Sequence, residues 1–179
     1  EDHGASPEFR VGGHLGRDER IISDIREGVD PHRFTADPLT GAGPSTDRQG
    51  AKSHTFKPLY GGQSGTKAEQ AYYKAFREKY SGITETQNRW IREVLRTKQL
   101  VTETGLIFYW PDCKVTHTGY IVNREAICNY PVQSLATADI IPIALVYQWH
   151  KMKARKLKSF IVNTVHDSIA AELCPEETE

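Results

Sequence analysis

Residues 48 to 60 constrain the fold of this chain of 179 residues more than any other stretch. Arg48, Lys52, Phe56 and Tyr60 recur at every fourth position, so on an α-helix they share one slowly turning face, each about 6 Å from the next. Two cations followed by two aromatic rings suit a nucleoside triphosphate, because cations bind phosphate oxygens and rings pack on a base. The alternative is an amphipathic helix whose basic residues point to water.

The residues after this row predict where the helix ends. Tyr60 is followed by Gly61 and Gly62, and glycines allow the chain to turn sharply or to lie close to a nucleic acid backbone. Pro58 lacks a backbone donor and crowds the carbonyl of His54, which predicts a kink.

The whole pattern, Arg-x3-Lys-x3-Phe-x3-Tyr-Gly, resembles the fingers motif of the family A DNA polymerases, which include bacterial DNA polymerase I and many phage replicases. The resemblance implies that Arg48 and Lys52 meet the triphosphate of the incoming dNTP and that Phe56 packs on its sugar and base. It also implies that Tyr60 lies beside the templating position, with Gly61 next to the DNA.

Two β-prone runs near the C-terminus, residues 158–165 and 168–173, predict a hairpin with a very tight turn at His166 and Asp167. A hairpin tip holds a carboxylate firmly, and Mg²⁺ prefers such hard oxygen ligands. By resemblance this is the palm motif, in which Asp167 binds the catalytic metal ions and His166 approaches the primer end. Taken alone, an Asp at a turn is usually a turn former.

A third segment, Asn129-Tyr-Pro-Val-Gln133 with the residues up to 141, is similar to the family's entry into a long palm helix. The resemblance implies that the amides of Asn129 and Gln133 reach the minor groove of the primer-template. Acceptors there are shared by all base pairs, so amides would test pair shape without reading sequence. Without the family context, both residues read as local hydrogen-bonders at a helix N-cap.

The opening residues 7–18 and the run 22–36 resemble the first palm motif and the following helix. The family motif is Asp-x4-Glu, in which the Asp binds metal and the Glu crowds a ribose 2′-hydroxyl. Glu8 fits the Glu of this motif, and the resemblance implies that it hydrogen-bonds Tyr60. The residue five before Glu8, where the motif has its Asp, is His3, and Asp2 is one residue too early. Because two metal ions need more than one carboxylate, a catalytically inactive DNA-binding remnant is an alternative.

These motifs together imply a template-directed DNA polymerase that transfers a deoxynucleotide from a dNTP to a primer 3′-hydroxyl, with Mg²⁺ as cofactor and primer-template DNA as partner. Arg48, Lys52 and Asp167 are the expected catalytic residues. A third interpretation, a metal phosphohydrolase using His166, Asp167 and His32, is disfavoured because such pairs usually lie on helices, whereas these flanks alternate like strands.

Length and composition add limits. The matches span the palm core and fingers without a thumb, so the sequence is interpreted as part of a longer polymerase. Equal numbers of basic and acidic residues, 23 each, do not by themselves favour DNA binding. Three irregularly spaced cysteines predict neither a disulfide framework nor a zinc site, and no apolar run of membrane length occurs. A reducing compartment follows, and the resemblance implies the cytoplasm of a bacterial or phage-infected cell.

Periodicity and stop signals predict the layout. Helices are expected at 18–27, 66–80 and 84–98, the last opened by a capping box from Thr84 to Gln87, and β-prone runs return at 100–110 and 119–122. A long helix from Val132 to about Arg155 should bend at Pro142. Strand, helical insertion, strands, helix and hairpin make an α+β fold, an antiparallel palm sheet with a helical fingers subdomain inserted. The expected divisions are 1–36 (palm), 37–99 (fingers) and 100–179 (palm).

Overall fold

The computed structural model describes residues 7–29, 57–165 and 168–177. The chain divides into two compact units, Glu1–Val132 and Gln133–Glu179. The helices within these ranges are all too short or too polar to cross a membrane. The predicted divisions at residues 36 and 99 stay predictions.

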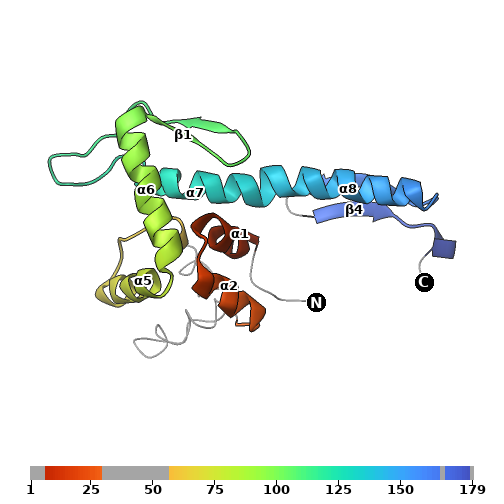
Figure 1. Cartoon of the computed structure of the whole chain (residues 1–179), viewed down its shortest axis with the longest axis horizontal. Helices are drawn as coiled ribbons and strands as arrows, with labels where there is room; N and C mark the ends of the chain where they lie inside the picture. The colour runs from red at the N-terminus through yellow and green to blue at the C-terminus, as the bar shows by residue number, and fades with distance from the viewer. Residues whose placement is uncertain (1–6, 30–56, 166–167, 178–179) are drawn as a thin grey trace. The chain divides into compact units, whose positions relative to one another are not determined.

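The first unit opens with two helices, α1 (Pro7–Gly16) and α2 (Glu19–Arg26) (Figure 1). Pro7 suits the first position of α1, where its missing N–H costs nothing and its fixed φ is already helical. The expected layout began with a strand, but the first described element is this helix. Its buried side, which includes Phe9, Val11 and Leu15, faces the core.

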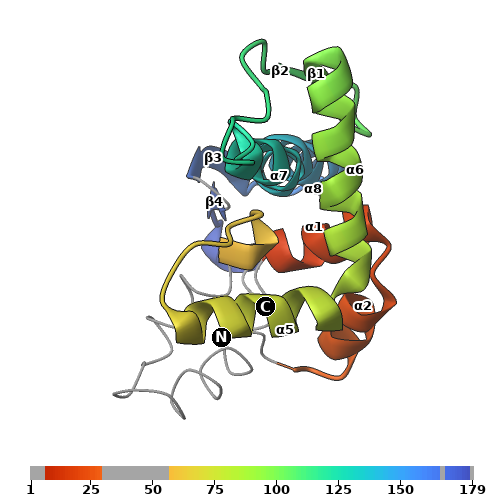
Figure 2. The ribbon, with the colours of Figure 1, turned by 90° about the vertical axis from the view of Figure 1, so that its left-hand side faces the viewer.

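Helices α5 (Lys67–Lys79) and α6 (Ser81–Thr97) follow one another with only Tyr80 between them. Figure 2 shows α6 meeting α5 near its own start and then passing α1, with which it packs. The prediction of a helix at 66–80 is confirmed, since Thr66 is the N-cap and Tyr80 the C-cap of α5. The capping box of this unit pairs Thr66 with Glu69. The backbone N–H of Glu69 donates to the Thr66 hydroxyl at 3.3 Å, and the backbone N–H of Thr66 donates to the Glu69 carboxylate at 2.6 Å.

Helix α6 starts at Ser81 rather than at Thr84, so the capping box predicted there is wrong. Its N-terminus is capped from a distance instead, because Asp18 Oδ2 accepts a hydrogen bond of 3.1 Å from the backbone N–H of Ile83. The other oxygen of Asp18 caps α2 by accepting from Arg20 and Ile21. Gly82 permits this approach, since a Cβ there would lie 2.8 Å from the carbonyl oxygen of Gly16.

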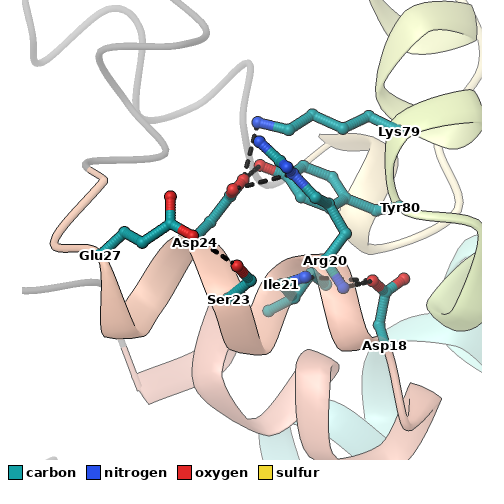
Figure 3. Close-up of polar contacts among 8 residues, drawn as sticks. All are labelled: Asp18, Arg20, Ile21, Ser23, Asp24, Glu27, Lys79 and Tyr80. Carbon is teal, nitrogen blue, oxygen red and sulfur yellow. Dashed lines mark hydrogen bonds and ion pairs between the residues drawn. The ribbon is translucent and has the colours of Figure 1, made fainter.

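A second buried carboxylate joins α2 to the α5–α6 corner (Figure 3). Asp24 is 1% exposed. Its carboxylate forms ion pairs with Lys79 Nζ at 2.7 Å and Arg20 Nε at 2.9 Å, and it accepts a hydrogen bond from the Tyr80 hydroxyl at 2.8 Å. Burial raises the pKa of the Tyr80 phenol far above its usual range, and the hydrogen bond to Asp24 adds to this. Tyr80 therefore stays a neutral donor at all ordinary pH values.

Aromatic rings fill the core of this unit. Phe76 and Tyr80 pack edge to face at 4.8 Å, and Phe9 of α1 meets Tyr80 at 5.4 Å. Trp90, Ile91 and Val94 of α6 are buried, and Leu95 is half-buried.

The β-prone run after α6 forms a short hairpin, β1 (Gln99–Val101) and β2 (Ile107–Tyr109), in antiparallel register. A single bridge between Val115 and Ile121 follows. Both were expected as strands of the sheet that includes the C-terminal hairpin. In the described residues, however, each pair of strands forms its own two-stranded sheet.

The predicted long helix is longer and less regular than expected. It comprises α7 (Arg124–Gln133), a π-helical stretch η1 (Ser134–Asp139) and α8 (Ile140–Ala154). Pro131 lies inside α7 and Pro142 in the first turn of α8, and neither can donate a backbone hydrogen bond. The π-helical stretch lies between the two prolines, and at its end the N–H of Ile140 donates to the carbonyl of Leu135, five residues earlier. Such π stretches and prolines are the usual sites where helices depart from a straight α-helix.

The second unit contains α8 with the predicted C-terminal hairpin, β3 (Phe160–Val165) and β4 (Ser168–Glu172), beside it (Figure 1). The strands are antiparallel, and pairing of Val165 with Ser168 confirms a connection of two residues. A short 3-10 helix, η2 (Pro175–Glu177), places Glu177 next to the residues that precede β3. The Glu177 carboxylate accepts hydrogen bonds from the backbone N–H groups of Lys158 and Ser159. Those bonds lower the pKa of Glu177. Helices with small antiparallel sheets confirm the α+β class.

Candidate functional site

One pocket in the first unit collects two of the residues that the sequence singled out. It encloses about 460 Å³, and its lining residues are Lys57, Tyr60, Gly62, Ser64, Glu125, Ala126, Asn129 and Tyr130. Tyr60 and Asn129 are far apart in the sequence, and folding brings them to the same cavity. One wall is the turn after residue 57 and the other is one face of α7.

The turn follows a helical stretch at the C-terminal end of the four-residue repeat, whose residues 48–56 lie outside the described ranges. Lys57 to Leu59 are helical, and the chain leaves the helix at Tyr60. The N–H of Gly61 bonds to the carbonyl of Pro58 at 3.0 Å and that of Gly62 to the carbonyl of Lys57 at 2.7 Å. Together with the left-handed φ of +79° at Gly61, these two bonds define a Schellman helix end. The predicted stop is therefore confirmed.

Side chains from two other helices hold this helix end. Gln87 of α6 is 3% exposed, and its Nε2 donates to the carbonyls of Leu59 at 2.6 Å and Pro58 at 3.3 Å. From α7, Arg124 Nε donates to the carbonyl of Gly61 at 3.3 Å. The last carbonyls of a helix have no partner inside it, so these donors replace water.

The packing around Gly61 is equally close. A Cβ at Gly61 would lie 2.7 Å from the Sγ of Cys128, and Leu59 is fully buried against Gly12 of α1. Burial raises the pKa of the Cys128 thiol to about 12, so this sulfur is a neutral packing group. Glycine is needed at position 61 both for its left-handed φ and for the approach of α7.

Charged side chains of both signs lie beside the turn. Lys57 Nζ lies 5.5 Å from the ring centre of Tyr73, and burial raises the pKa of that phenol to about 12. Burial also lowers the pKa of Arg77, and the neighbouring Arg124 contributes to this. Glu125 is the acidic residue in the pocket lining. With Lys57, the lining therefore carries one cation and one carboxylate.

Asn129 lies in the middle of α7, so the alternative that it is a helix N-cap is wrong. Its side-chain Oδ1 is buried and has no hydrogen-bond partner among the residues that the structure describes. Gln133 is the last residue of the same helix. Side chains four residues apart project from the same face of a helix. The two amides that the resemblance assigned to one DNA groove therefore share a helix face.

The remaining predicted site residues are placed as follows. Glu8 is half-buried in the first turn of α1, and its hydrogen bond to Tyr60 stays a prediction. The other predicted positions lie outside the described residues, namely Arg48, Lys52, Phe56, His166, Asp167, Asp2, His3 and His32. Among the residues described, no group of three or more His, Cys, Asp or Glu could hold a metal ion.

Sequence reasoning missed Gln87 and Arg124. Gln87 was expected only as the last residue of a capping box at Thr84, and Arg124 lies in no recognisable motif, whereas each donates to a main-chain carbonyl far away in the sequence. A carbonyl has no sequence signature, so only the folded structure could identify these donors.

The packing at Gly61 leads to a stability prediction with a matched control. Gly28 ends α2 with the same two hydrogen bonds and a φ of +71°, but a Cβ there would touch nothing within 4 Å. Gly28→Ala should therefore cost only the left-handed backbone, about 1 kcal/mol. Gly61→Ala adds a clash with Cys128 and should cost about 3 kcal/mol. Urea denaturation of both variants measures the difference, and equal losses would contradict the packing argument.

Comparison with known proteins places these features in a family. The model of DNA polymerase family A matches residues 5–179. DNA polymerase I of Caldicellulosiruptor bescii is 27% identical over 186 residues, which cover 96% of this chain and 22% of the relative. The thermostable DNA polymerase I of Thermus filiformis is 32% identical over 187 residues, with the same two coverages. The chain thus spans about a fifth of the length of the curated relatives it matches.

A solved structure shares the fold. The POL domain of Pol1 from M. smegmatis, in complex with DNA primer-template and dNTP, superposes with a TM-score of 0.76 at 23% identity. The superposition covers 95% of this chain and 32% of the other.

Proposed function

Because this chain belongs to DNA polymerase family A, we propose that it forms the nucleotide-selecting part of a DNA-directed DNA polymerase. The reaction is transfer of a deoxynucleotide from a dNTP to the 3′-hydroxyl of a primer. The observation that carries the proposal is the pocket that joins Tyr60, at the end of the nucleotide-binding helix, to Asn129 on the helix assigned to the DNA duplex.

This pocket has the composition that a single-stranded template needs. Tyr60 and Tyr130 offer aromatic faces for a base, and Lys57 offers a cation for the backbone. The buried Oδ1 of Asn129 still has capacity for a hydrogen bond. Asn129 and Gln133 would contact the minor groove, with Gly61 and His166 also beside the DNA.

The nucleotide would be held by the helix that ends at Leu59. On its predicted face Arg48 and Lys52 bind the triphosphate and offset the charge that develops on the departing pyrophosphate. Phe56 packs on the sugar and base, and Glu8 crowds the ribose position. The palm and fingers divisions, 1–36, 37–99 and 100–179, belong to the same proposal.

Mg²⁺ is the proposed cofactor, which would polarise the reacting oxygens. Asp167 would supply a carboxylate from the turn between β3 and β4, where the pairing of Val165 with Ser168 leaves room for two residues. That position suits a hard oxygen ligand. Asp2 is the second candidate in the sequence, at a spacing one residue longer than the family motif.

Primer extension by the full-length protein tests the function. With a labelled primer-template and one dNTP at a time, the primer should grow only with the dNTP that pairs with the templating base, and chelation of divalent ions should stop growth. Addition of all four dNTPs regardless of template would contradict the proposal.

The residue five before Glu8 favours a second candidate, a DNA-binding polymerase remnant without catalysis. His3 stands where the family motif has its first carboxylate. A remnant would bind primer-template in a gel-shift assay and yet show no extension with any dNTP or divalent ion. Extension by the wild-type protein excludes it.

A further inference from the structure

The strongest unexplained feature of the first unit is how many side chains converge on the end of one helix. Three carbonyls, those of Pro58, Leu59 and Gly61, accept hydrogen bonds from side chains of α6 and α7. The α2 end at Gly28 has backbone bonds within the same helix, and the α5 end accepts a side-chain bond from Thr84 of α6 to the carbonyl of Tyr80 at 2.9 Å, but the end at residue 59 accepts donors from two helices. The end at residue 59 is therefore anchored as well as capped.

Arg124 is the more informative of the two donors because of where it lies. It belongs to α7, and Cys128, one turn further along, packs on Gly61. The next residue, Asn129, lines the pocket with Tyr60. Arg124 and Cys128 therefore couple the position of α7, which carries Asn129, to the position of the helix end.

We propose that Arg124 is a positioning residue that ties the end of the nucleotide-binding helix to α7, with Gln87 holding the same end from α6. The inference rests on the proposed function. The row of Arg48, Lys52 and Phe56 precedes this end on one predicted helix, so a fixed end limits the positions that the row can take. Arg124 touches neither nucleotide nor DNA and acts through the carbonyl of Gly61.

A loosened anchor has a defined kinetic consequence. The arrangement that binds a dNTP would be populated for a smaller fraction of the time, and apparent affinity falls by that fraction. Once the nucleotide is saturating, the bound state is restored. The dNTP KM should therefore rise while kcat stays nearly unchanged.

The test uses the full-length protein with Arg124→Gln, Arg124→Lys and Arg92→Gln. Arg124→Gln should raise the dNTP KM about fivefold, the effect of losing one hydrogen bond, and should also alter the ratio of matched to mismatched primer extension. Lysine retains a long cationic donor and should recover most of the loss. Arg92 is exposed on α6, and its variant should behave as wild type. Gln87→Met, which removes the amide donor at similar volume, should raise KM in the same way.

Hydrogen exchange of residues 57–62 provides a second readout. Their amides should exchange faster in Arg124→Gln, with thermal unfolding within the range of Arg92→Gln. An unchanged KM and unchanged exchange would overturn the inference. Absence of extension by wild-type protein would instead refute the proposed function, and the exchange rates would still decide whether Arg124 anchors the helix end.

Discussion

Lys52→Ala in the full-length protein is expected to lower the rate of correct nucleotide incorporation by about a hundredfold, the usual effect of removing one charge-stabilising group from an active site. The proposed function assigns Lys52 to the triphosphate, whose negative charge increases at the leaving pyrophosphate as the reaction proceeds. The lost interaction therefore stabilises the transition state more than the bound DNA. Single-turnover incorporation measures the rate, and a gel-shift assay should show nearly unchanged primer-template affinity.

A matched lysine controls for the loss of one charge. Lys74 is exposed on α5, and its Nζ lies 3.9 Å from Glu78. Lys74→Ala should leave incorporation unchanged. Equal rates for Lys52→Ala and wild type would refute the role of Lys52. Equal losses of rate and of DNA affinity would instead show that Lys52 binds the DNA and not the triphosphate.

Asp24→Ala is expected to lower the free energy of unfolding by about 3 kcal/mol, because it removes the acid from a buried cluster and leaves cations behind. Asp24 receives Lys79, Tyr80 and Arg20, and the Lys79 side chain is only 19% exposed (Figure 3). Without the carboxylate, the desolvated ammonium of Lys79 loses this partner. Urea denaturation followed by circular dichroism measures the loss.

An exposed ion pair in the same region provides the comparison. Glu78 and Lys74 have side chains 68% and 75% exposed, and water already solvates both. Glu78→Ala should cost about 0.3 kcal/mol. A similar cost for Asp24→Ala would show that the cluster adds no more than a surface pair.

Elements with local signals were predictable to within a residue or two. Helix α2 has Asp18 as its N-cap and Gly28 just after its end, and the helix at 66–80 has Thr66 and Tyr80 as its caps. The C-terminal hairpin followed from β-prone runs separated by two residues. In each case the residues that start or stop the element lie within it or beside it, so the information is local.

Other boundaries were not predictable because distant residues decide them. Helix α6 begins at Ser81 since Asp18 caps it across the fold, and a local capping motif at Thr84 was misleading. Helix α7 begins at Arg124, eight residues before the predicted start. A bend was expected at Pro142, and a π-helical stretch, Ser134–Asp139, precedes this proline in the structure.

By itself the sequence determined the family, the α+β class and the helix stop at Tyr60 and Gly61, because these depend on residue types at fixed spacings along the chain. Only the tertiary structure decided that Tyr60 and Asn129 line one pocket and that Gln87 and Arg124 hold the helix end. Those contacts join main-chain carbonyls and side chains that lie far apart in the sequence. Their formation depends on how α6 and α7 pack, and packing is a property of the folded chain.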